Sequence, residues 1–325
     1  MSDHILEVKD LTIHYFVDKS VIKAVNGISF ELSQGESLGL VGETGAGKTT
    51  TALGIMRLVP NPPGRIVSGS ILYHGEDLCA KSEEEMRRIR GHEISMIFQD
   101  PMTALNPVLT VGDQISEVIM LHQKVTKHEA MRKAMDMMET VGIEGERCNE
   151  YPHQFSGGMQ QRIVIAIALA CNPSLLLADE PTTALDVTIQ EQVLYLIETL
   201  KKKFGTSLVL ITHDLGVVAE VCDRVGIVYA GKVVEYGTLE HIYNHTAHPY
   251  TLGLFGSIPD FSKKVRRLKP IPGLMPDPAN LPDGCVFAER CPEAREACRH
   301  GVIPNTEIAP GHWVRCLNFV KGERV

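Results

Sequence analysis

Apolar and polar residues follow patterns that predict strands at the start and in the middle of this chain. Three short runs are almost continuously apolar, SLGLVG at 37–42, SLLLA at 174–178 and TSLVLIT at 206–212. Such runs are expected of strands that are buried on both faces of a parallel sheet. The first 32 residues alternate instead (ILEVKDLTIHYF, then AVNGISFEL), which predicts antiparallel strands.

Helical spacing fills much of the chain between these runs. TTALGIMRLV follows the first run and stops at PNPPG, residues 60–64. Residues 108–172 are expected to be mainly helical. There, apolar residues recur at spacings of three and four: Ala130, Met131, Ala134, Met135, Met138 and Val141. Asp186 is the expected N-cap of a further helix that ends near Lys201. The alternation predicts an α/β fold with a mostly parallel sheet core, an antiparallel β subdomain and a helical subdomain.

The chain changes character after residue 248. Prolines concentrate from Pro249 onward, so an extended and turning segment is expected there. We therefore predict two parts, a domain of residues 1–248 and a C-terminal extension of residues 249–325. The basic run KKVRRLK at 263–269 is interpreted as a solvated face.

Composition narrows the classes of protein that fit. The 325 residues include 32 Lys and Arg against 40 Asp and Glu, a formal net charge of −8. A chain with this net negative charge does not attract the phosphate backbone of a nucleic acid, so nucleic acid is not an expected partner. The start, MSDHILEVKD, lacks a secretory pattern. The longest apolar run, at 163–171, falls short of the ~20 residues that span a bilayer. A cytosolic protein, or one peripheral to a membrane, is expected.

The motif GETGAGKTT at 42–50 is the strongest chemical signal. It fits a phosphate-binding loop between a strand and a helix, in which backbone N–H groups and the helix N-terminus hold phosphates. Lys48 is expected to neutralise the β- and γ-phosphates, and Thr49 to hold Mg²⁺. The nucleotide-binding residues predicted here are Gly42, Glu43, Thr44, Gly45, Ala46, Gly47, Lys48, Thr49 and Thr50.

Two adjacent carboxylates end the apolar run SLLLADE, residues 174–180. Ligands of open parallel sheets lie at the carboxyl ends of strands, so Asp179 is expected to reach the Mg²⁺. Glu180, one residue further, is the expected general base for the attacking water.

One further segment, FSGGMQQR at 155–162, indicates a single class of nucleotide hydrolase. This segment resembles the signature motif of the ATP-binding subunits of ABC transporters. The other marks of that family occur in the expected order: Tyr15, Gln99 in FQDP, Asp186 in TTALD and His213 in LITHD. The resemblance implies an ABC-type ATPase fold, ATP and Mg²⁺ as cofactors, and an adenine contact for Tyr15.

The signature motif precedes a helix whose N-terminus is suited to bind phosphate. The chain already has one such phosphate site, in the loop at 42–50. The resemblance implies that two homologous ATPase subunits stack head to tail, so that Ser156, Gly157 and Gly158 contact the ATP of the partner. It also implies that His213 holds the γ-phosphate. Gln99 would link the Mg²⁺ and the water to the segment that contacts the membrane subunits.

Further segments resemble a narrower family, the importers of dipeptides, oligopeptides and nickel. These are QDPMTALNPVLTVGDQI at 99–115, HPYTLGLFGSIPD at 248–260 and IPGLMPDPANLPDGCVFAERCP at 271–292. We predict that the transported cargo is a dipeptide or an oligopeptide, and nickel or another solute is the alternative. The resemblance implies a second ATPase, two membrane-spanning permeases, an external substrate-binding protein and a place at the cytoplasmic face of the membrane.

Two other classes of function remain open from the sequence. One is a soluble ABC ATPase that acts on DNA or ribosomes, which the acidic balance and the single cassette disfavour. The other is an iron–sulfur sensor with vestigial ATPase parts, which the intact Lys48, Asp179, Glu180 and His213 disfavour.

Four of the eight cysteines crowd near the end of the chain: Cys285, Cys291, Cys298 and Cys316. A reducing compartment disfavours disulfides, so a metal site is expected. The gaps of five, six and seventeen residues are wider than those of a zinc knuckle. They suit a [4Fe-4S] cluster, which the resemblance to the importer family also implies for this cysteine pattern; Zn²⁺ is the alternative. Free thiols are a third option, and His300 and His312 are expected to be solvated rather than ligands.

Overall fold

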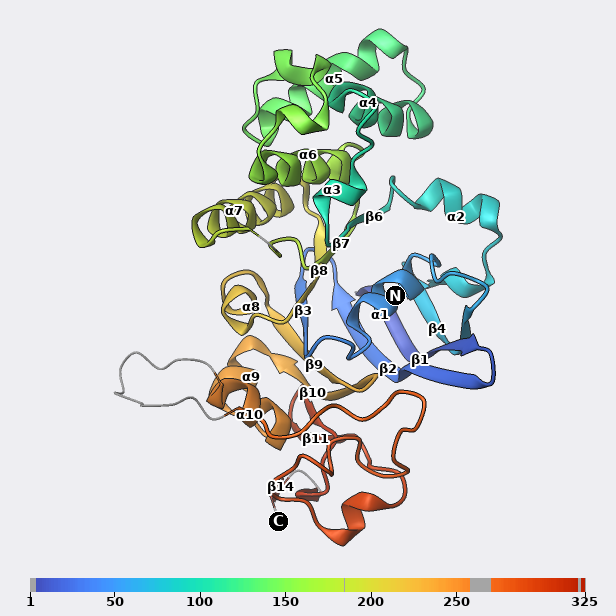
Figure 1. The fold of residues 1–325 in the computed structure, drawn as a ribbon, viewed down its shortest axis with the longest axis vertical. Coiled ribbons are helices and arrows are strands. Elements are labelled where there is room, and N and C mark those ends of the chain that lie inside the picture. Colours follow the sequence, from blue (N-terminus) through green and yellow to red (C-terminus); the bar gives the residue numbers. More distant parts are fainter. Residues whose placement is uncertain (1–3, 184, 258–269, 321–322, 325) are drawn as a thin grey trace. The chain divides into compact units, whose positions relative to one another are not determined.

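The structure is a computed structural model that describes residues 4–183, 185–257, 270–320 and 323–324. Its contacts divide the chain into two compact units. The first unit comprises Met1–Leu6, Glu31–Ser37 and Leu72–Thr212, and the second comprises Glu7–Phe30, Leu38–Ile71 and His213–Val325. Figure 1 labels the elements of both. The basic run at 263–269, residues 258–260 of the segment HPYTLGLFGSIPD and Ala184 of TTALD lie outside the described residues.

Three parallel strands form the centre of the first unit. They are β6 (Ile94–Ile97), β7 (Leu175–Asp179) and β8 (Ser207–Thr212). Strand β7 pairs with both others, since Leu175 lies opposite Ile94 on one side and Ser207 on the other. Every residue of the three strands is buried. The two buried strands predicted at 174–178 and 206–212 are confirmed, because continuous apolar runs supply side chains for both faces of a sheet.

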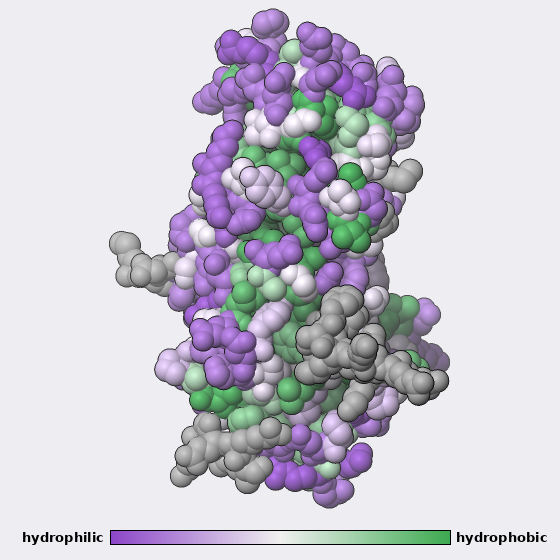
Figure 2. Space-filling view, turned by 90° about the vertical axis from the view of Figure 1, so that its left-hand side faces the viewer, coloured by the Kyte–Doolittle hydropathy of each residue, from purple (hydrophilic) through white to green (hydrophobic). Residues whose placement is uncertain are grey.

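The longer helices of the first unit begin at polar capping residues. They are α4 (Val111–His122), α5 (Lys127–Thr140), α6 (Gly157–Leu169) and α7 (Val187–Phe204), with N-caps Thr110, Thr126, Ser156 and Asp186. Each cap side chain accepts a backbone N–H of the first turn. The predicted apolar face of α5 is confirmed by the burial of Ala130, Ala134 and Met138. Hydrophilic residues cover much of the helical segment at the top of Figure 2.

Shorter elements complete the first unit. They are β5 (Glu76–Asp77), α2 (Glu83–Ile89), α3 (Pro101–Ala104) and the 3₁₀ turns Leu78–Ala80, Gly145–Asn149 and Pro152–Gln154. The capping box of α2 links Ser82 and Glu85, whose side chains satisfy each other's backbone N–H groups.

The second unit contains most of the predicted N-terminal strands. Strands β1 (His4–Val17), β2 (Ser20–Ser33) and β4 (Gly64–Tyr73) are neighbours in the order β2-β1-β4. Within this unit, part of a second sheet runs in the order β11-β12-β10-β9-β3. In it, β3 (Ser37–Val41) is parallel to β9 (Arg224–Tyr229), and β10 (Lys232–Thr238) is antiparallel to β9. All five residues of β3 are buried, as its apolar run predicts.

The C-terminal segment extends this second sheet. Strand β12 (His312–Val314) pairs antiparallel with β10, with Glu235 opposite Val314, and β11 (Thr306–Ala309) pairs with β12. Sequence analysis predicted an extended and turning segment without these strands. At four and three residues, they are too short to show a readable alternation.

The other elements of the second unit are mostly short helices. They are α1 (Lys48–Ile55), α8 (Leu215–Val221), α9 (Leu239–Asn244), α10 (Pro249–Gly256), the 3₁₀ turn Glu296–Arg299 and the strand pair β13 (Phe319–Val320) and β14 (Glu323–Arg324). The helix predicted after the first apolar run is α1, and it ends before the proline-rich turn that stops it.

Candidate functional site

The predicted phosphate loop connects β3 to α1. Lys48 is 5% exposed, and its Nζ donates to the carbonyl oxygens of Gly42, at 2.7 Å, and Glu43, at 3.1 Å. The ammonium group of Lys48 is therefore folded onto the loop, where it bonds to two backbone carbonyls. Gly47, the N-cap of α1, provides no side-chain cap, which leaves the first turn suited to an anion.

Two glycines of the loop are required by the backbone. A Cβ on Gly42 would lie 2.1 Å from the Val228 carbonyl oxygen, and one on Gly47 would lie 2.3 Å from that of Ala24. Gly47 also has a φ of 99°, which side chains disfavour. Positions 42 and 47 of the motif therefore require glycine, because backbone carbonyl oxygens of neighbouring strands lie too close for a side chain.

Glu43, which directly follows Gly42, is held by residues far along the chain. Its carboxylate accepts from Arg290 Nη1 at 3.0 and 2.9 Å, and its backbone N–H donates to the Tyr250 hydroxyl at 3.1 Å. Arg290 also donates to the Tyr229 hydroxyl at 3.2 Å. Sequence analysis missed this network, since no motif marks Arg290.

Tyr15 lies on β1 and is partly exposed. Its ring edge would be 2.6 Å from a Cβ on Gly64, so the glycine makes room for the ring. The contact of Tyr15 with adenine stays a prediction.

Asp179 and Glu180 end β7 in the first unit, as predicted. Asp179 is 2% exposed, and Glu180 has a φ of 46°. Glu180 Oε2 accepts from Gln99 Nε2 at 3.0 Å and from Thr183 Oγ1 at 2.9 Å. The structure thus brings together Gln99 and Glu180, both of which are predicted to act on the attacking water.

The signature segment forms the N-terminus of α6. Ser156 Oγ accepts the Met159 N–H at 3.4 Å. A Cβ on Gly157 would meet no heavy atom within 4 Å, whereas one on Gly158 would lie 2.7 Å from Ile189 of α7. Gly158 is therefore required by packing within the chain, while Gly157 faces open space.

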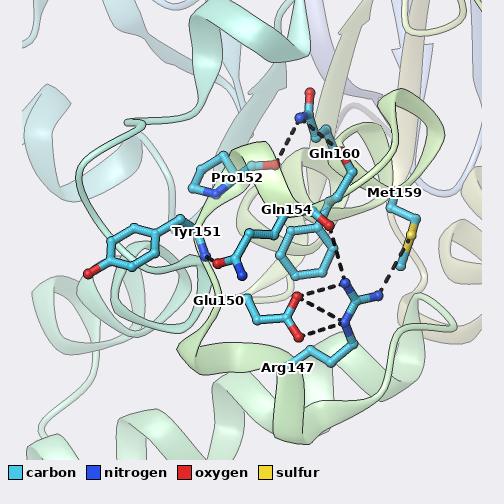
Figure 3. Close-up of polar contacts among 8 residues, drawn as sticks. Arg147, Glu150, Tyr151, Pro152, Gln154, Met159 and Gln160 are labelled. Atoms are coloured by element: carbon cyan, nitrogen blue, oxygen red, sulfur yellow. Dashed lines mark hydrogen bonds and ion pairs between the residues drawn. The ribbon is translucent and has the colours of Figure 1, made fainter.

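A polar network supports the segment that leads into this helix (Figure 3). Arg147 donates to Glu150 at 2.7 Å and lies 4.3 Å from the centre of the Phe155 ring. Gln160 donates to the Pro152 carbonyl at 2.9 Å. The pKa of Glu150 is lowered, first by its hydrogen bond with Arg147. Sequence analysis missed Arg147, because its partners are recognised only once the turn has formed.

Asp186 and His213 have different surroundings. Asp186 Oδ1 accepts the Ile189 N–H at 3.0 Å, which confirms the predicted N-cap of α7. His213 directly follows β8, is exposed, and falls in the second unit. Their predicted roles toward nucleotide stay predictions.

Known proteins resemble this chain along almost its whole length. The dipeptide transport ATP-binding protein DppD of Bacillus subtilis (strain 168) is 49% identical over 316 residues, 97% of this chain and 94% of the relative. The oligopeptide transport ATP-binding protein AppD of the same organism is 50% identical over 317 residues, 97% of each. The chain belongs to the ABC transporter ATPase family. The family described as "ABC transporter" matches residues 25–183.

The structural comparison gives the same fold. One similar solved structure is the dimeric structure of a post-hydrolysis state of the ATP-binding cassette MJ0796 bound to ADP and Pi. Its TM-score with this chain is 0.65 and its sequence identity is 28%, and the match covers 72% of this chain and 98% of that one. The family described as "Oligopeptide/dipeptide transporter, C-terminal region" matches residues 234–298. As a family member, the chain is an ATP hydrolase with an ABC-type α/β fold, and it uses ATP and Mg²⁺. Among the described residues, no helix combines the length and hydrophobicity needed to cross a membrane.

The four clustered cysteines of the ABC ATPase line one pocket. This cysteine pocket has a cavity volume of about 10 Å³, and His248, Phe287 and Asn318 contribute to its wall. Within the described ranges, no group of three or more His, Cys, Asp or Glu side chains is arranged to hold a metal ion. The predicted metal site is therefore not shown, although the pocket brings its four cysteines together.

Burial disfavours thiolates in this pocket. It raises the pKa of Cys285 and Cys316, and it raises that of Cys291 to about 11. Neighbouring cysteines raise all three pKa values further. Backbone N–H groups oppose this shift by hydrogen bonding to sulfur, from Phe287, Ala288, Glu293 and Asn318. Deprotonation of Cys285, Cys291 and Cys316 is therefore disfavoured near pH 7, and a bound cation would be needed to stabilise their thiolates.

One expectation for this region is wrong. His312 was expected to be solvated, but it is 1% exposed, and its Nε2 lies 2.9 Å from Oε1 of the equally buried Glu235. Glu235 also accepts the N–H groups of Ala247 and His248. The burial follows from the pairing of β12 with β10, which the sequence did not reveal. His300 is exposed, as expected.

Proposed function

We propose that this ABC ATPase hydrolyses ATP to drive the import of dipeptides or oligopeptides across the cytoplasmic membrane. The observation that carries this proposal is the identity of about half over nearly the full length to proteins named for dipeptide and oligopeptide transport. The match of residues 234–298 to a C-terminal region described for oligopeptide and dipeptide transporters supports the same cargo.

The residues of the phosphate loop would bind the triphosphate. Lys48 would exchange its contacts with the loop carbonyls for the β- and γ-phosphates, and N–H groups of the loop and α1 would donate to them. Tyr15 would stack on adenine, and His213 would contact the γ-phosphate. Bound Mg²⁺ would neutralise charge on the phosphates, and its ligands would be Thr49, Gln99 and Asp179.

Glu180 would act on the attacking water. Its Oε2 already accepts two hydrogen bonds, from Gln99 and Thr183, which hold the carboxylate in one orientation. A carboxylate so fixed can accept the proton of a water that Gln99 also contacts. This arrangement supports Glu180 as the general base and Gln99 as the residue that positions it.

We further propose that each ATP is shared between two homologous subunits. Ser156, Gly157 and Gly158 would contact the triphosphate bound mainly by the second ATPase subunit, while Asp186 would lie near the same nucleotide. The open space at Gly157 supports this role, since a phosphate needs close approach to the helix N-terminus. Two membrane-spanning permeases and an external binding protein would complete the importer, with the ATPases peripheral to the cytoplasmic face.

The Gly157→Asp variant tests the shared nucleotide. A Cβ at this position would meet no heavy atom within 4 Å in the single chain, but a carboxylate there would repel the triphosphate held by the second subunit. Hydrolysis by the two-subunit assembly is expected to fall at least about tenfold. Gly256→Asp is the matched control, because Gly256 is exposed and also has no heavy atom near its Cβ position. Equal phosphate-release rates for the two variants would contradict the contact.

The cargo is tested by transport itself. The ATPase, its second ATPase subunit, permeases and binding protein would be reconstituted in vesicles with labelled dipeptide, labelled pentapeptide or nickel ions. ATP-dependent uptake of a peptide is expected. Uptake of nickel without peptide would overturn the peptide cargo and leave the ATPase assignment intact.

We propose that the cysteine pocket holds a [4Fe-4S] cluster through Cys285, Cys291, Cys298 and Cys316, with Zn²⁺ as the alternative. The gathering of all four around one pocket supports this, as do the N–H groups aimed at sulfur. Lys232 and Arg315 line an adjoining pocket beside Cys285. Their positive charges would offset part of the negative charge of four thiolates. Such a group would order a segment that is poor in regular structure.

Anaerobic purification tests this metal site. The protein is expected to be brown and to contain about four iron atoms per chain. Cys291→Ser is expected to lose most of the iron, whereas Cys79→Ser, outside the pocket, keeps it. A colourless protein loaded with zinc would overturn the iron–sulfur proposal.

A further inference from the structure

We propose that Arg290 controls the phosphate loop by neutralising Glu43, and that ATP binding therefore depends on the integrity of the cysteine segment, residues 285–316. The inference rests on the proposed nucleotide site at residues 42–50. It assigns to the C-terminal part of the chain a direct role in nucleotide affinity.

The ion pair between Arg290 and Glu43 is fixed mainly from the arginine side. The Arg290 side chain is 7% exposed, against 32% for Glu43. Arg290 Nε donates to the Pro272 carbonyl at 2.9 Å, and Nη2 donates to that of Ile271 at 3.4 Å. With its other donors engaged, the guanidinium cannot turn away without losing several hydrogen bonds.

The position of Glu43 makes its charge important. Its backbone carbonyl accepts from Lys48 Nζ at 3.1 Å, so the residue is part of the loop that would surround the triphosphate. A free carboxylate there would repel phosphates, and it would also compete for Lys48. Arg290 neutralises that charge and holds the Glu43 carboxylate by two hydrogen bonds from Nη1.

Arg290 lies within the segment that supplies much of the wall of the cysteine pocket, between the lining residues Ala288 and Cys291. It lies directly before Cys291, and its own N–H donates to the Phe287 carbonyl at 3.0 Å. The Cys285 N–H donates to the Cys298 carbonyl at 2.7 Å, which closes the segment around the pocket. Loss of that closure would release the arginine.

An aromatic cluster provides a second connection. The Phe287 ring lines the cysteine pocket and lies 5.2 Å from the Tyr229 ring and 5.3 Å from the Tyr250 ring, between centroids. Tyr229 accepts from Arg290, and Tyr250 accepts the Glu43 N–H. The aromatic cluster therefore connects the pocket, through Phe287, with Arg290 through Tyr229 and with Glu43 through Tyr250.

A double-mutant cycle on the full-length chain tests the proposal. Affinity would be measured with a fluorescent ATP analogue and Mg²⁺. Arg290→Met is expected to weaken binding about tenfold, because it leaves Glu43 unpaired. In a Glu43→Gln background the same change is expected to alter binding less than about threefold. Arg299→Met is the control, since Arg299 is exposed in the same segment.

Two outcomes of the cycle would overturn the proposal. One is unchanged binding by Arg290→Met. The other is an equal loss in both backgrounds, which would mean that Arg290 merely holds the segment together. Absence of binding in Lys48→Ala together with normal binding in Arg290→Met would reject this inference alone. Normal binding in Lys48→Ala would instead reject the nucleotide site.

A second cycle tests the dependence on the cysteine segment. Cys291→Ser is expected to weaken binding of the same analogue about tenfold in the wild-type background and by less than about threefold with Glu43→Gln. Equal losses in both backgrounds, or no loss in either, would show that the cysteine segment does not act through Glu43.

Discussion

The Glu180→Gln variant is expected to bind ATP with near-wild-type affinity and to hydrolyse it about 10²- to 10³-fold more slowly. Glutamine keeps the size of the side chain and can still meet Gln99 and Thr183, which contact Glu180 Oε2. It cannot accept the proton of the attacking water. Phosphate release by the assembled transporter, measured beside nucleotide binding, separates the chemical step from affinity.

Glu191→Gln is the matched control for this variant, because Glu191 is exposed on α7 in the same unit. It is expected to hydrolyse ATP at the wild-type rate. If Glu180→Gln retained hydrolysis within about threefold of that control, the general base would have to be another group.

The Lys48→Ala variant is expected to lose ATP binding by at least about 10²-fold. Lys48 is the buried cation of the phosphate loop, and charge-assisted hydrogen bonds to phosphate are among the strongest in proteins. Its Nζ also joins the carbonyls of Gly42 and Glu43, so its loss loosens the loop as well.

Equilibrium binding of a fluorescent ATP analogue measures this loss. Lys19→Ala serves as the control, since Lys19 is exposed near the turn between β1 and β2. Affinity of Lys48→Ala within a few-fold of that of Lys19→Ala would contradict the assignment of the phosphate loop.

Features set by contiguous residues were predictable. The apolar runs of β3, β7 and β8 mark strands buried on both faces, and GETGAGKTT places a loop between a strand and α1. Asp186 as an N-cap needs only the polar residue and the helix that follows it. In each case the interactions that decide the structure lie within a few residues.

Features set by distant partners were not predictable. Arg290 and Glu43 are 247 residues apart, and neither residue type indicates the other. The burial of His312 depends on the pairing of β12 with β10, which brings it beside Glu235, a buried carboxylate in the middle of β10. Gly157 and Gly158 look alike in the sequence, and only the packing of Ile189 separates them. Such pairs depend on tertiary packing, which local patterns do not encode.

The sharing of ATP between two subunits is tested most directly by a structure of the Glu180→Gln chain with its natural second ATPase subunit, Mg²⁺ and ATP. We expect the Ser156 hydroxyl and the N–H groups of Gly157 and Gly158 to lie about 3 Å from phosphate oxygens of the nucleotide held by the other subunit's phosphate loop. A closed assembly with both ATP molecules bound and these groups turned to solvent would contradict the account.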